Sequence, residues 1–301
     1  MLRYRLLVGP ILILGLLAGF WLDALVDGVP LPGWLAEASG RETWPRGTVL
    51  LAMAIPISVL AARELAYLLK AKGLVASRFV MTISAIAGLG VSCFVPAGAG
   101  GVQAVAVSST AAMAVLVGSV AYYSRRQSLE GVVAGAGGAL LAFVYLGLMF
   151  GFVLAIRREH SIWLLLWVLL TTKACDVGAY FTGRFLGRHK LIQWLSPKKT
   201  WEGLYGGIAF AALIGWLGTL ALGLWAGEVA PGPVVAAFLG GLFGLVGQMG
   251  DLFASALKRD AGAKDSGQTL PGFGGVIDVL DSPLLVAPVA YWMLALAIPV
   301  G

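Results

Sequence analysis

Long apolar stretches recur along the whole chain and are separated by short polar segments. About 20 mostly apolar residues are enough for a helix to cross the hydrocarbon core of a bilayer, which is about 30 Å thick. The pattern therefore predicts an all-α, polytopic transmembrane fold with about nine spans and a polar site facing the cytoplasm. The predicted spans are residues 6–22, 48–69, 79–96, 102–121, 131–156, 162–181, 204–226, 233–250 and 283–300.

The composition agrees with a chain embedded in lipid. Hydrophobic residues make up 59% of the chain and charged residues 12%, whereas soluble domains have roughly 45–50% and 25%. We expect a single integral-membrane domain over residues 1–301, with N-terminal helices in 1–160 and the polar motifs in 161–301. The first apolar stretch follows basic residues, as in a signal peptide. It lacks a small-residue cleavage site, so we interpret it as a retained span.

The basic residues predict how the chain is oriented. Short loops rich in Lys and Arg stay in the cytoplasm, and with nine spans fifteen basic residues fall on the side of the N-terminus. We therefore expect a multi-pass protein of the inner (plasma) membrane with a cytoplasmic N-terminus. Four basic residues fall on the other side, including the Arg157-Arg158 pair, which breaks the rule.

The net charge of +6 does not indicate nucleic acid as a partner, because the basic residues are scattered over short loops without a platform of aromatic residues. Membrane lipids and phosphate-bearing substrates explain the charge better. The 42 glycines include runs at 131–138 and 240–250, where small side chains allow helices to pack closely. Such faces are also compatible with a homodimer.

Two inside segments, at about 182–203 and 251–282, are long, polar and rich in Gly, Lys and Asp. In the second segment, a helix over 251–259 would bring Asp251 and Ser255 to one face together with one of the basic residues that follow. A carboxylate and a cation would then share a site. The segment continues through a glycine-rich turn toward the last span.

Asp278 and Asp281 are three residues apart, so on a helix leading into the last span they would share a face. Together with Asp251 they predict a site for a divalent cation, because Mg²⁺ takes oxygen ligands and often combines one or two carboxylates with substrate phosphates. The alternative is a solvated loop whose acids cap helices. Spacing alone does not separate the two interpretations.

The segment from Ser255 to Asp281 contains Ser-x-x-Lys-Arg, Lys-Asp, Pro-Gly-x-Gly-Gly and Asp-x-x-Asp in succession. It closely resembles the signature of the phosphatidate cytidylyltransferase (CDP-diacylglycerol synthase) family. A second block from Asp176 to Gly203, with Ser-Pro-Lys-Lys-Thr-Trp-Glu-Gly at its end, is similar to the family's other cytoplasmic motif. The resemblance covers most of 173–282, while the N-terminal half matches only in hydropathy.

This resemblance implies that CTP and phosphatidic acid react to give CDP-diacylglycerol and pyrophosphate for phospholipid biosynthesis, with Mg²⁺ as cofactor and room for a second cation. The lipid phosphate is the nucleophile, which suits a sequence without a convincing Ser-His-Asp or Cys-His set. By the family pattern, Asp251, Asp278 and Asp281 would be metal-associated and catalytic, together with Lys258 and Lys264. The substrate-binding candidates are Arg184, Ser196, Lys198, Lys199, Thr200, Ser255, Arg259 and Asp265.

Some of these assignments have alternatives. In the alternative interpretation, Asp265 orients Lys264 instead of binding substrate, and Lys198 and Lys199 are ordinary basic residues of a cytoplasmic loop. Asp176 is expected to line the same cavity from its own span.

Two positions depart from the family's pattern. Phe273 replaces the histidine of the usual Pro-Gly-His-Gly-Gly turn, and Val279 replaces the arginine usual between the last two aspartates. Both changes leave the carboxylates intact but remove contacts to substrate. Two alternatives therefore stay open: the protein is a cytidylyltransferase for another lipid phosphate, or it is a catalytically weak paralogue.

Charged residues within the spans leave a non-enzyme alternative, a transporter or lipid-binding partner, since such residues also mark polar pathways. Lys173 and Asp176 are three apart and would pair with each other, whereas the sequence assigns no role to Arg63 or Glu64. No inverted repeat is evident, which counts against transport.

Overall fold

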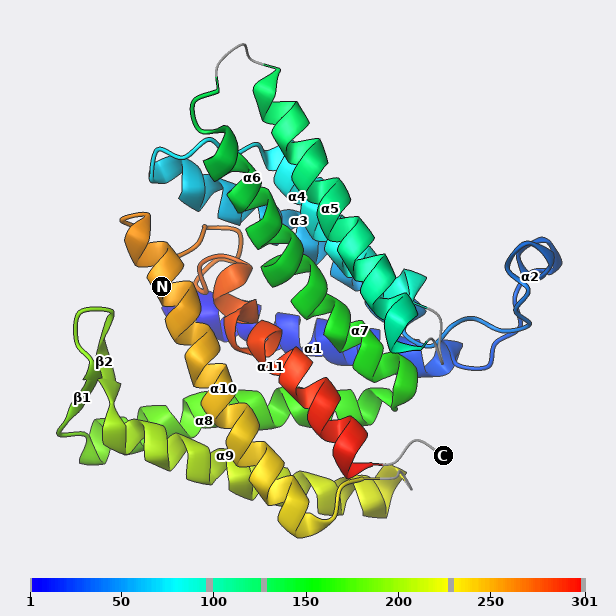
Figure 1. Cartoon of the computed structure of the whole chain (residues 1–301). Coiled ribbons are helices and arrows are strands. Elements are labelled where there is room, and N and C mark those ends of the chain that lie inside the picture. Colours follow the sequence, from blue (N-terminus) through cyan, green and yellow to red (C-terminus); the bar gives the residue numbers. More distant parts are fainter. Residues whose placement is uncertain (1, 96–99, 126–128, 227–229, 299–301) are drawn as a thin grey trace.

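The computed structural model describes residues 2–95, 100–125, 129–226 and 230–298, and most of them are helical (Figure 1). The N-terminal helices are α1 (Leu2–Val26), α2 (Gly33–Ser39), α3 (Thr48–Ala71), α4 (Arg78–Phe94), α5 (Gly101–Ser124), α6 (Val132–Leu141), the π-helix η1 (Ala142–Leu148) and α7 (Met149–Glu159). The C-terminal elements are α8 (Ile162–Leu186), β1 (Lys190–Ile192), β2 (Ser196–Thr200), α9 (Trp201–Ala221), the π-helix η2 (Leu222–Ala226), α10 (Pro233–Asp260) and α11 (Ile277–Ala297).

The predicted spans agree with these helices, and the all-α membrane fold is confirmed. Within the described residues, eight helices are long and apolar enough to cross a membrane, and α4, a shorter apolar helix of 17 residues, lies at the predicted span 79–96. The chain from α6 through η1 to α7 forms one of the eight. The short helix α2 and the β1–β2 hairpin were not predicted.

The helix ends differ from the predicted span ends where the polar motifs begin. Helix α10 continues to Asp260 rather than ending near residue 250, and α11 starts at Ile277 rather than near residue 283. The predicted helix over 251–259 is therefore the last part of α10, and the Asp278 and Asp281 carboxylates lie in the first two turns of α11. Polar residues extend these helices beyond the stretches that hydropathy alone recognises.

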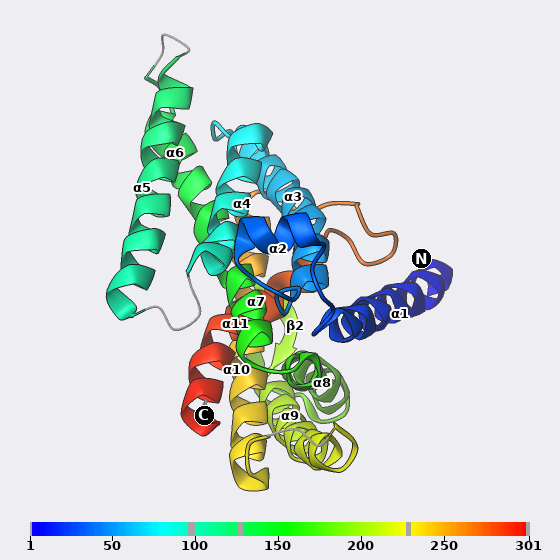
Figure 2. The ribbon, with the colours of Figure 1, turned by 90° about the vertical axis from the view of Figure 1, so that its right-hand side faces the viewer.

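Helices α8, α9 and α10 pack together, and α5 packs on α6, with α1 at one side of the molecule. Figure 2 shows α8, α9 and α10 together, α5 and α6 at the opposite end, and α1 standing apart, where it packs mainly on α3. Small residues allow the close crossings: a Cβ atom on Gly215 of α9 would lie 3.0 Å from the Cα atom of Gly240 of α10. The interpretation of the 240–250 glycine run as a packing surface is confirmed there.

The Arg157-Arg158 pair is not a solvated loop charge. Arg157 is only 1% exposed, and its guanidinium donates to Asp23 (2.5 Å), to Asp27 (2.6 Å) and to the carbonyl of His160 (3.2 Å). Asp23 in turn accepts a hydrogen bond from the backbone N–H of Leu50 at 3.0 Å. Arg157 and Asp23 therefore join α1, α3 and α7, so Arg157 has a structural role in helix packing.

The variant Arg157→Met should destabilise the fold by about 3–5 kcal/mol, because it leaves the Asp23 carboxylate buried without its partner. Methionine keeps much of the volume of the arginine side chain, so the loss of stability measures the effect of removing the charge. Thermal unfolding in detergent measures it, and the exposed Arg46 supplies the control Arg46→Met. Equal melting temperatures for the two variants would contradict a structural role for the ion pair of Arg157 with Asp23.

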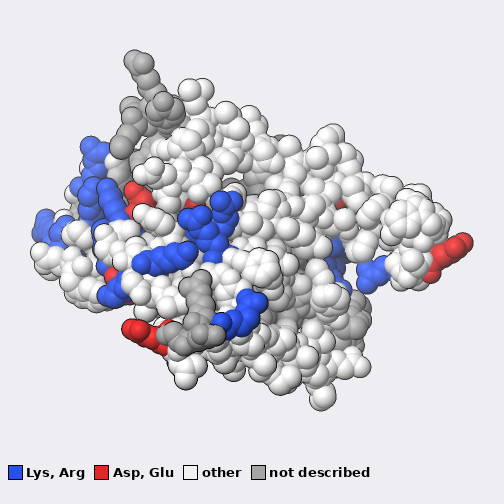
Figure 3. Space-filling model, turned by 90° about the horizontal axis from the view of Figure 1, so that it is seen from above, with Lys and Arg blue, Asp and Glu red and all other residues white. Residues whose placement is uncertain are grey.

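Basic side chains gather at one end of the molecule. In Figure 3, Lys and Arg are concentrated on the left half of the face shown. The same side of Figure 1 holds the β1–β2 hairpin and the C-terminal end of α10. The motif-bearing segments therefore lie at the more basic end of the helices.

Candidate active site

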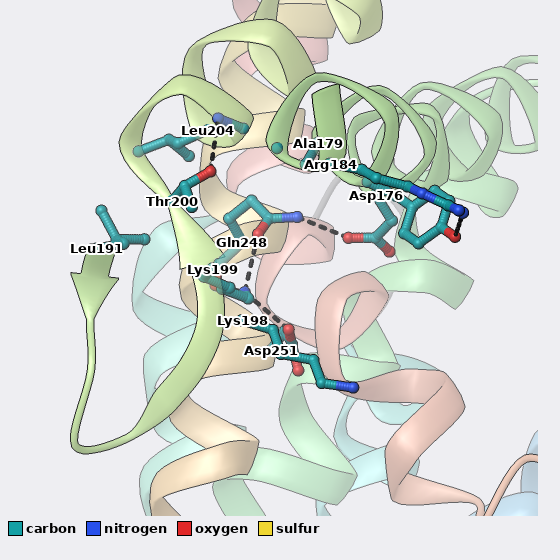
Figure 4. A pocket seen from close by; sticks show the side chains of 13 residues that line it. Asp176, Ala179, Arg184, Leu191, Lys198, Lys199, Thr200, Leu204, Gln248 and Asp251 are labelled. Carbon is teal, nitrogen blue, oxygen red and sulfur yellow. Dashed lines mark hydrogen bonds and ion pairs between the residues drawn. The ribbon is translucent and has the colours of Figure 1, made fainter. Parts of the chain in front are cut away.

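A cavity of 460 Å³ opens between α8, α9, α10 and strand β2 (Figure 4). The cavity lies at the basic end of the fold, where Asp251 of α10 meets the Asp176–Gly203 motif block. Its polar lining consists of Asp176, Tyr180, Arg184, Lys198, Lys199, Thr200, Gln248 and Asp251.

Lys199 lies at the centre of the polar contacts. Its ammonium is 2.7 Å from Oδ2 of Asp251 and donates to Oε1 of Gln248 at 2.8 Å. The amide of Gln248 donates to Oδ1 of Asp176 at 2.6 Å, so one chain of contacts joins α8, α10 and β2. Gln248 was missed by the sequence analysis, and the only signal for it was an amide in the apolar span 233–250.

The hairpin holds the lysines over the cavity. Strands β1 and β2 pair antiparallel, with Lys190 opposite Thr200. Thr200, a substrate-binding candidate, is the N-cap of α9 and accepts a hydrogen bond from the N–H of Gly203 at 3.1 Å. The base of the hairpin is fixed by the ring of His189, which is 2.6 Å from Glu202. This histidine thus lies on the hairpin and does not contact the aspartates.

The other candidates in the Asp176–Gly203 block occupy different surroundings. Arg184 is exposed at the cavity and donates to the hydroxyl of Tyr180 at 2.8 Å, so part of its guanidinium is open to a ligand. Ser196 is half-buried at the start of β2 and Lys198 is exposed. Arg184 and Lys198 line the cavity, whereas Ser196 does not.

Asp251 and Asp281 are brought together by close packing of α10 against α11. A Cβ atom on Gly250 would overlap the carbonyl oxygen of Asp281 and lie 3.1 Å from the Cα atom of Ser282, so only glycine fits there. The carboxyl groups of Asp251 and Asp281 are consequently neighbours. Of the three aspartates expected to share one cation site, the structure thus places Asp251 beside Asp281.

Lys173 extends this acidic cluster toward α8. Its ammonium is 3.5 Å from Asp176, the pairing expected from their spacing, and 3.7 Å from Asp281. Asp281 is 7% exposed, and its Oδ1 also accepts from the N–H of Ser282 at 2.6 Å. Three carboxylates and two lysines thus form one connected cluster, of which Asp176, Lys199 and Asp251 line the cavity.

Asp278 has different partners. Its Oδ1 accepts from Lys258 at 2.6 Å, and its Oδ2 accepts from the N–H groups of Ser266 and Gly275, both at 2.8 Å. The Lys258 and Asp278 side chains are 11% and 10% exposed, so this is a buried ion pair. Within the part of the chain that the structure describes, no three His, Cys, Asp or Glu side chains form a preassembled metal site.

The remaining candidates lie outside the cavity. Ser255 is half-buried on α10, and Arg259 is exposed and contacts the carbonyl of Ala263 at 3.5 Å. Lys264 and Asp265 are exposed in the loop between α10 and α11.

The two departures from the family motif have separate surroundings. Phe273 is 37% exposed, and its ring faces α1, where a Cβ atom on Gly9 would lie 3.2 Å from Cζ. Val279 is half-buried in the first turn of α11. An apolar ring at position 273 therefore packs on a neighbouring helix instead of reaching into the cavity.

The sequence model of the Cytidylyltransferase family matches residues 43–297. The chain belongs to this family. The match begins before α3, so it extends well beyond the 173–282 region in which the motif resemblance was recognised.

Three relatives carry the name phosphatidate cytidylyltransferase. The one from Synechocystis sp. is 44% identical over 127 residues, which are 42% of this chain and 41% of that protein. The one from Bacillus subtilis is 40% identical over 159 residues, 52% of this chain and 57% of the relative. The one from Helicobacter pylori is 39% identical over 149 residues, 50% and 53% of the two chains. The chain thus spans about half the length of the curated relatives it matches.

Proposed function

We propose that the protein transfers the cytidylyl group of CTP to phosphatidic acid and forms CDP-diacylglycerol and pyrophosphate. The observation that carries this proposal is the link from the cavity to the second aspartate motif: Lys199 contacts Asp251 in the cavity, and Asp251 lies beside Asp281. The relatives named phosphatidate cytidylyltransferase support the same substrates.

In the proposed reaction an oxygen of the lipid phosphate forms a bond to the α-phosphorus of CTP. The bond from that phosphorus to the oxygen of the departing pyrophosphate breaks. The protein needs no nucleophile of its own, because such transfers depend on positioning and on neutralising charge. Arg184, Lys198 and Lys199 are the cations of the cavity that would hold phosphate oxygens.

The carboxylates fit a divalent cation of the Mg²⁺ type. Asp251 and Asp281 offer hard oxygen ligands from two helices, and Mg²⁺ commonly binds one or two carboxylates together with substrate phosphates. The hydroxyl of Tyr145, on η1, is buried without a hydrogen-bond partner among the described residues and lies within electrostatic range of the aspartates. A bound cation would neutralise charge on the phosphates. The predicted third ligand, Asp278, would first have to leave Lys258.

We further propose that the cavity faces the cytoplasm in a bacterial inner membrane. The basic end of the molecule supports this orientation, and so does the need for a soluble nucleotide. Lipid phosphates other than phosphatidic acid remain the second candidate substrates, because nothing in the cavity's polar lining selects an acyl chain. A homodimer stays a prediction.

The test is Mg²⁺-dependent conversion of labelled CTP into lipid by the detergent-purified protein with phosphatidic acid. Turnover should stop on chelation, and the variant Lys199→Met should lower kcat/KM for CTP by about 10–100-fold, because a charge-assisted contact is lost. Lys190→Met, at the exposed base of the same hairpin, is the matched control. A wild-type protein that turns over no lipid phosphate would refute the proposal, and equal activity of both variants would remove Lys199 from the site.

A further inference from the structure

Glu64 is a buried carboxylate that belongs to none of the recognised motifs. It lies in the middle of α3, in the N-terminal half of the chain, and is 6% exposed. No Lys or Arg pairs with it in the part of the chain that the structure describes. A buried carboxylate is costly unless hydrogen bonds satisfy it, so its partners are informative.

All of its hydrogen bonds come from residues 266–277, within the Ser255–Asp281 motif segment and more than 200 residues away. Oε1 accepts from the hydroxyl of Thr269 at 2.5 Å and from the N–H of Val276 at 2.8 Å. Oε2 accepts from the hydroxyl of Ser266 and from the N–H of Ile277, both at 3.0 Å. Two backbone and two side-chain donors therefore converge on one carboxylate.

The two backbone donors are the N–H groups at the start of α11. The first N–H groups of a helix have no partner within the helix, and Val276, the N-cap, has no side chain that could accept from them. Glu64 satisfies them from another helix, and its negative charge is favourable at the helix N-terminus. It thereby fixes where α11 begins, one turn before Asp281.

The glycine-rich turn is shaped around this carboxylate. A Cβ atom on Gly275 would overlap both Oε2 of Glu64 and the hydroxyl of Ser266, and one on Gly267 would lie 2.9 Å from Oε1. Glycine at these positions lets the loop close onto Glu64. Of the glycines in the Pro-Gly-x-Gly-Gly turn, Gly275 is thus explained by a residue outside the motif.

Ser266 connects Glu64 to the site. Its hydroxyl is 3.0 Å from Oε2 of Glu64 and 2.9 Å from Oδ2 of Asp278, so its single hydrogen serves one of two carboxylates at a time. Its N–H donates to Asp278, which is also held by Lys258. Movement at Glu64 would therefore be transmitted to both Asp278 and the first turns of α11.

We propose that Glu64 is a positioning residue for the reaction: it holds the 261–276 loop and the start of α11 so that Asp278 and Asp281 keep their places. This inference rests on the proposed function for its catalytic consequence, but its structural part does not. The position requires a carboxylate, because a glutamine of the same size would turn its NH₂ group toward a backbone N–H of Val276 or Ile277.

The experiment compares Glu64→Gln with Glu159→Gln in the detergent-purified full chain. Glu159 is the matched control, since it also receives a hydrogen bond from α11, at the far end of that helix, from Tyr291 at 2.8 Å. Hydrogen exchange of residues 261–280 is the first readout, and it needs no activity. The second readout is kcat together with the Mg²⁺ concentration that gives half-maximal turnover.

Glu64→Gln should speed exchange in 261–280 by about 10-fold or more and lower kcat by about 10–100-fold, because hydrogen bonds to a charged group are lost. It should also raise the half-maximal Mg²⁺ concentration and leave KM for CTP unchanged, while Glu159→Gln matches the wild type. Unchanged exchange in 261–280 would overturn the inference. So would faster exchange with wild-type kcat and Mg²⁺ dependence, which is the result of a merely structural role.

A second pair of variants keeps the test decisive if Glu64→Gln does not fold. Thr269→Val removes one hydroxyl donor to Glu64, and Ser266→Ala removes the other together with the link to Asp278. Ser266→Ala should shift the Mg²⁺ dependence more than Thr269→Val, and the reverse order would overturn the inference. A wild-type protein without turnover would refute the proposed reaction, whereas exchange would still report the contacts of Glu64.

Discussion

Replacing Asp281 with asparagine should lower kcat by about 10²–10³-fold, the cost of removing one preorganised electrostatic group from an active site. Asparagine has nearly the same shape, and its carbonyl oxygen can still accept from the N–H of Ser282. The change removes the charge that faces Lys173 and neighbours Asp251. Initial rates of CTP incorporation into lipid at saturating substrate measure the effect.

The matched control is Asp260→Asn. Asp260 also lies in a motif-bearing helix, but it is 63% exposed and pairs with Lys72 at 2.9 Å on the surface. Surface pairs of this kind contribute little to stability, so this variant should keep wild-type kcat. Full activity in Asp281→Asn would remove Asp281 from the proposed cation site.

The variant Asp278→Asn should destabilise the protein by about 3–5 kcal/mol and abolish most activity, because it leaves the Lys258 ammonium buried without its partner. The amide oxygen can still accept from the N–H groups of Ser266 and Gly275. The glycine-rich loop therefore keeps part of its anchoring. Thermal unfolding in detergent and the lipid assay measure the two effects separately.

The double variant Lys258→Met with Asp278→Asn distinguishes a structural pair from a catalytic one. Removing both charges of a buried pair is often neutral for stability, so the double variant should regain most of the melting temperature lost by the single one. Its activity should stay low, because the ammonium and the carboxylate are both missing from the site. Recovery of activity together with stability would mean that the pair only supports the fold.

Lys173 and Asp176 illustrate how intramembrane charge is tolerated here. They pair with each other at 3.5 Å, and Lys173 also approaches Asp281. Glu64, in contrast, is satisfied by hydrogen-bond donors alone. Four charged residues suggested a transport pathway. Three of them, Lys173, Asp176 and Glu64, have partners in α8, α10, α11 or the loop before α11. The fourth, Arg63, is exposed.

Hydropathy and motif spacing determined much about this protein from the sequence alone. Apolar length follows directly from the thickness of a bilayer, so the helical spans could be located without knowing their packing. Spacing of three and four residues likewise placed Asp278 and Asp281 on one helix and Asp251 near Lys258. These are properties of single helices, which local sequence encodes.

Only the tertiary structure decided which side chains meet. The contacts of Arg157 with Asp23 and of Glu64 with Ile277 join residues far apart in the chain, and no local pattern specifies such partners. Helix packing also separated Asp278, which binds Lys258, from Asp251 and Asp281, which adjoin because Gly250 lets two helices touch. The sequence by itself determined the helices and most charged groups of the candidate site, but not Gln248 or Glu64. The folded packing of α3, α10 and α11 decided their arrangement, because partners across helices depend on which surfaces fit together.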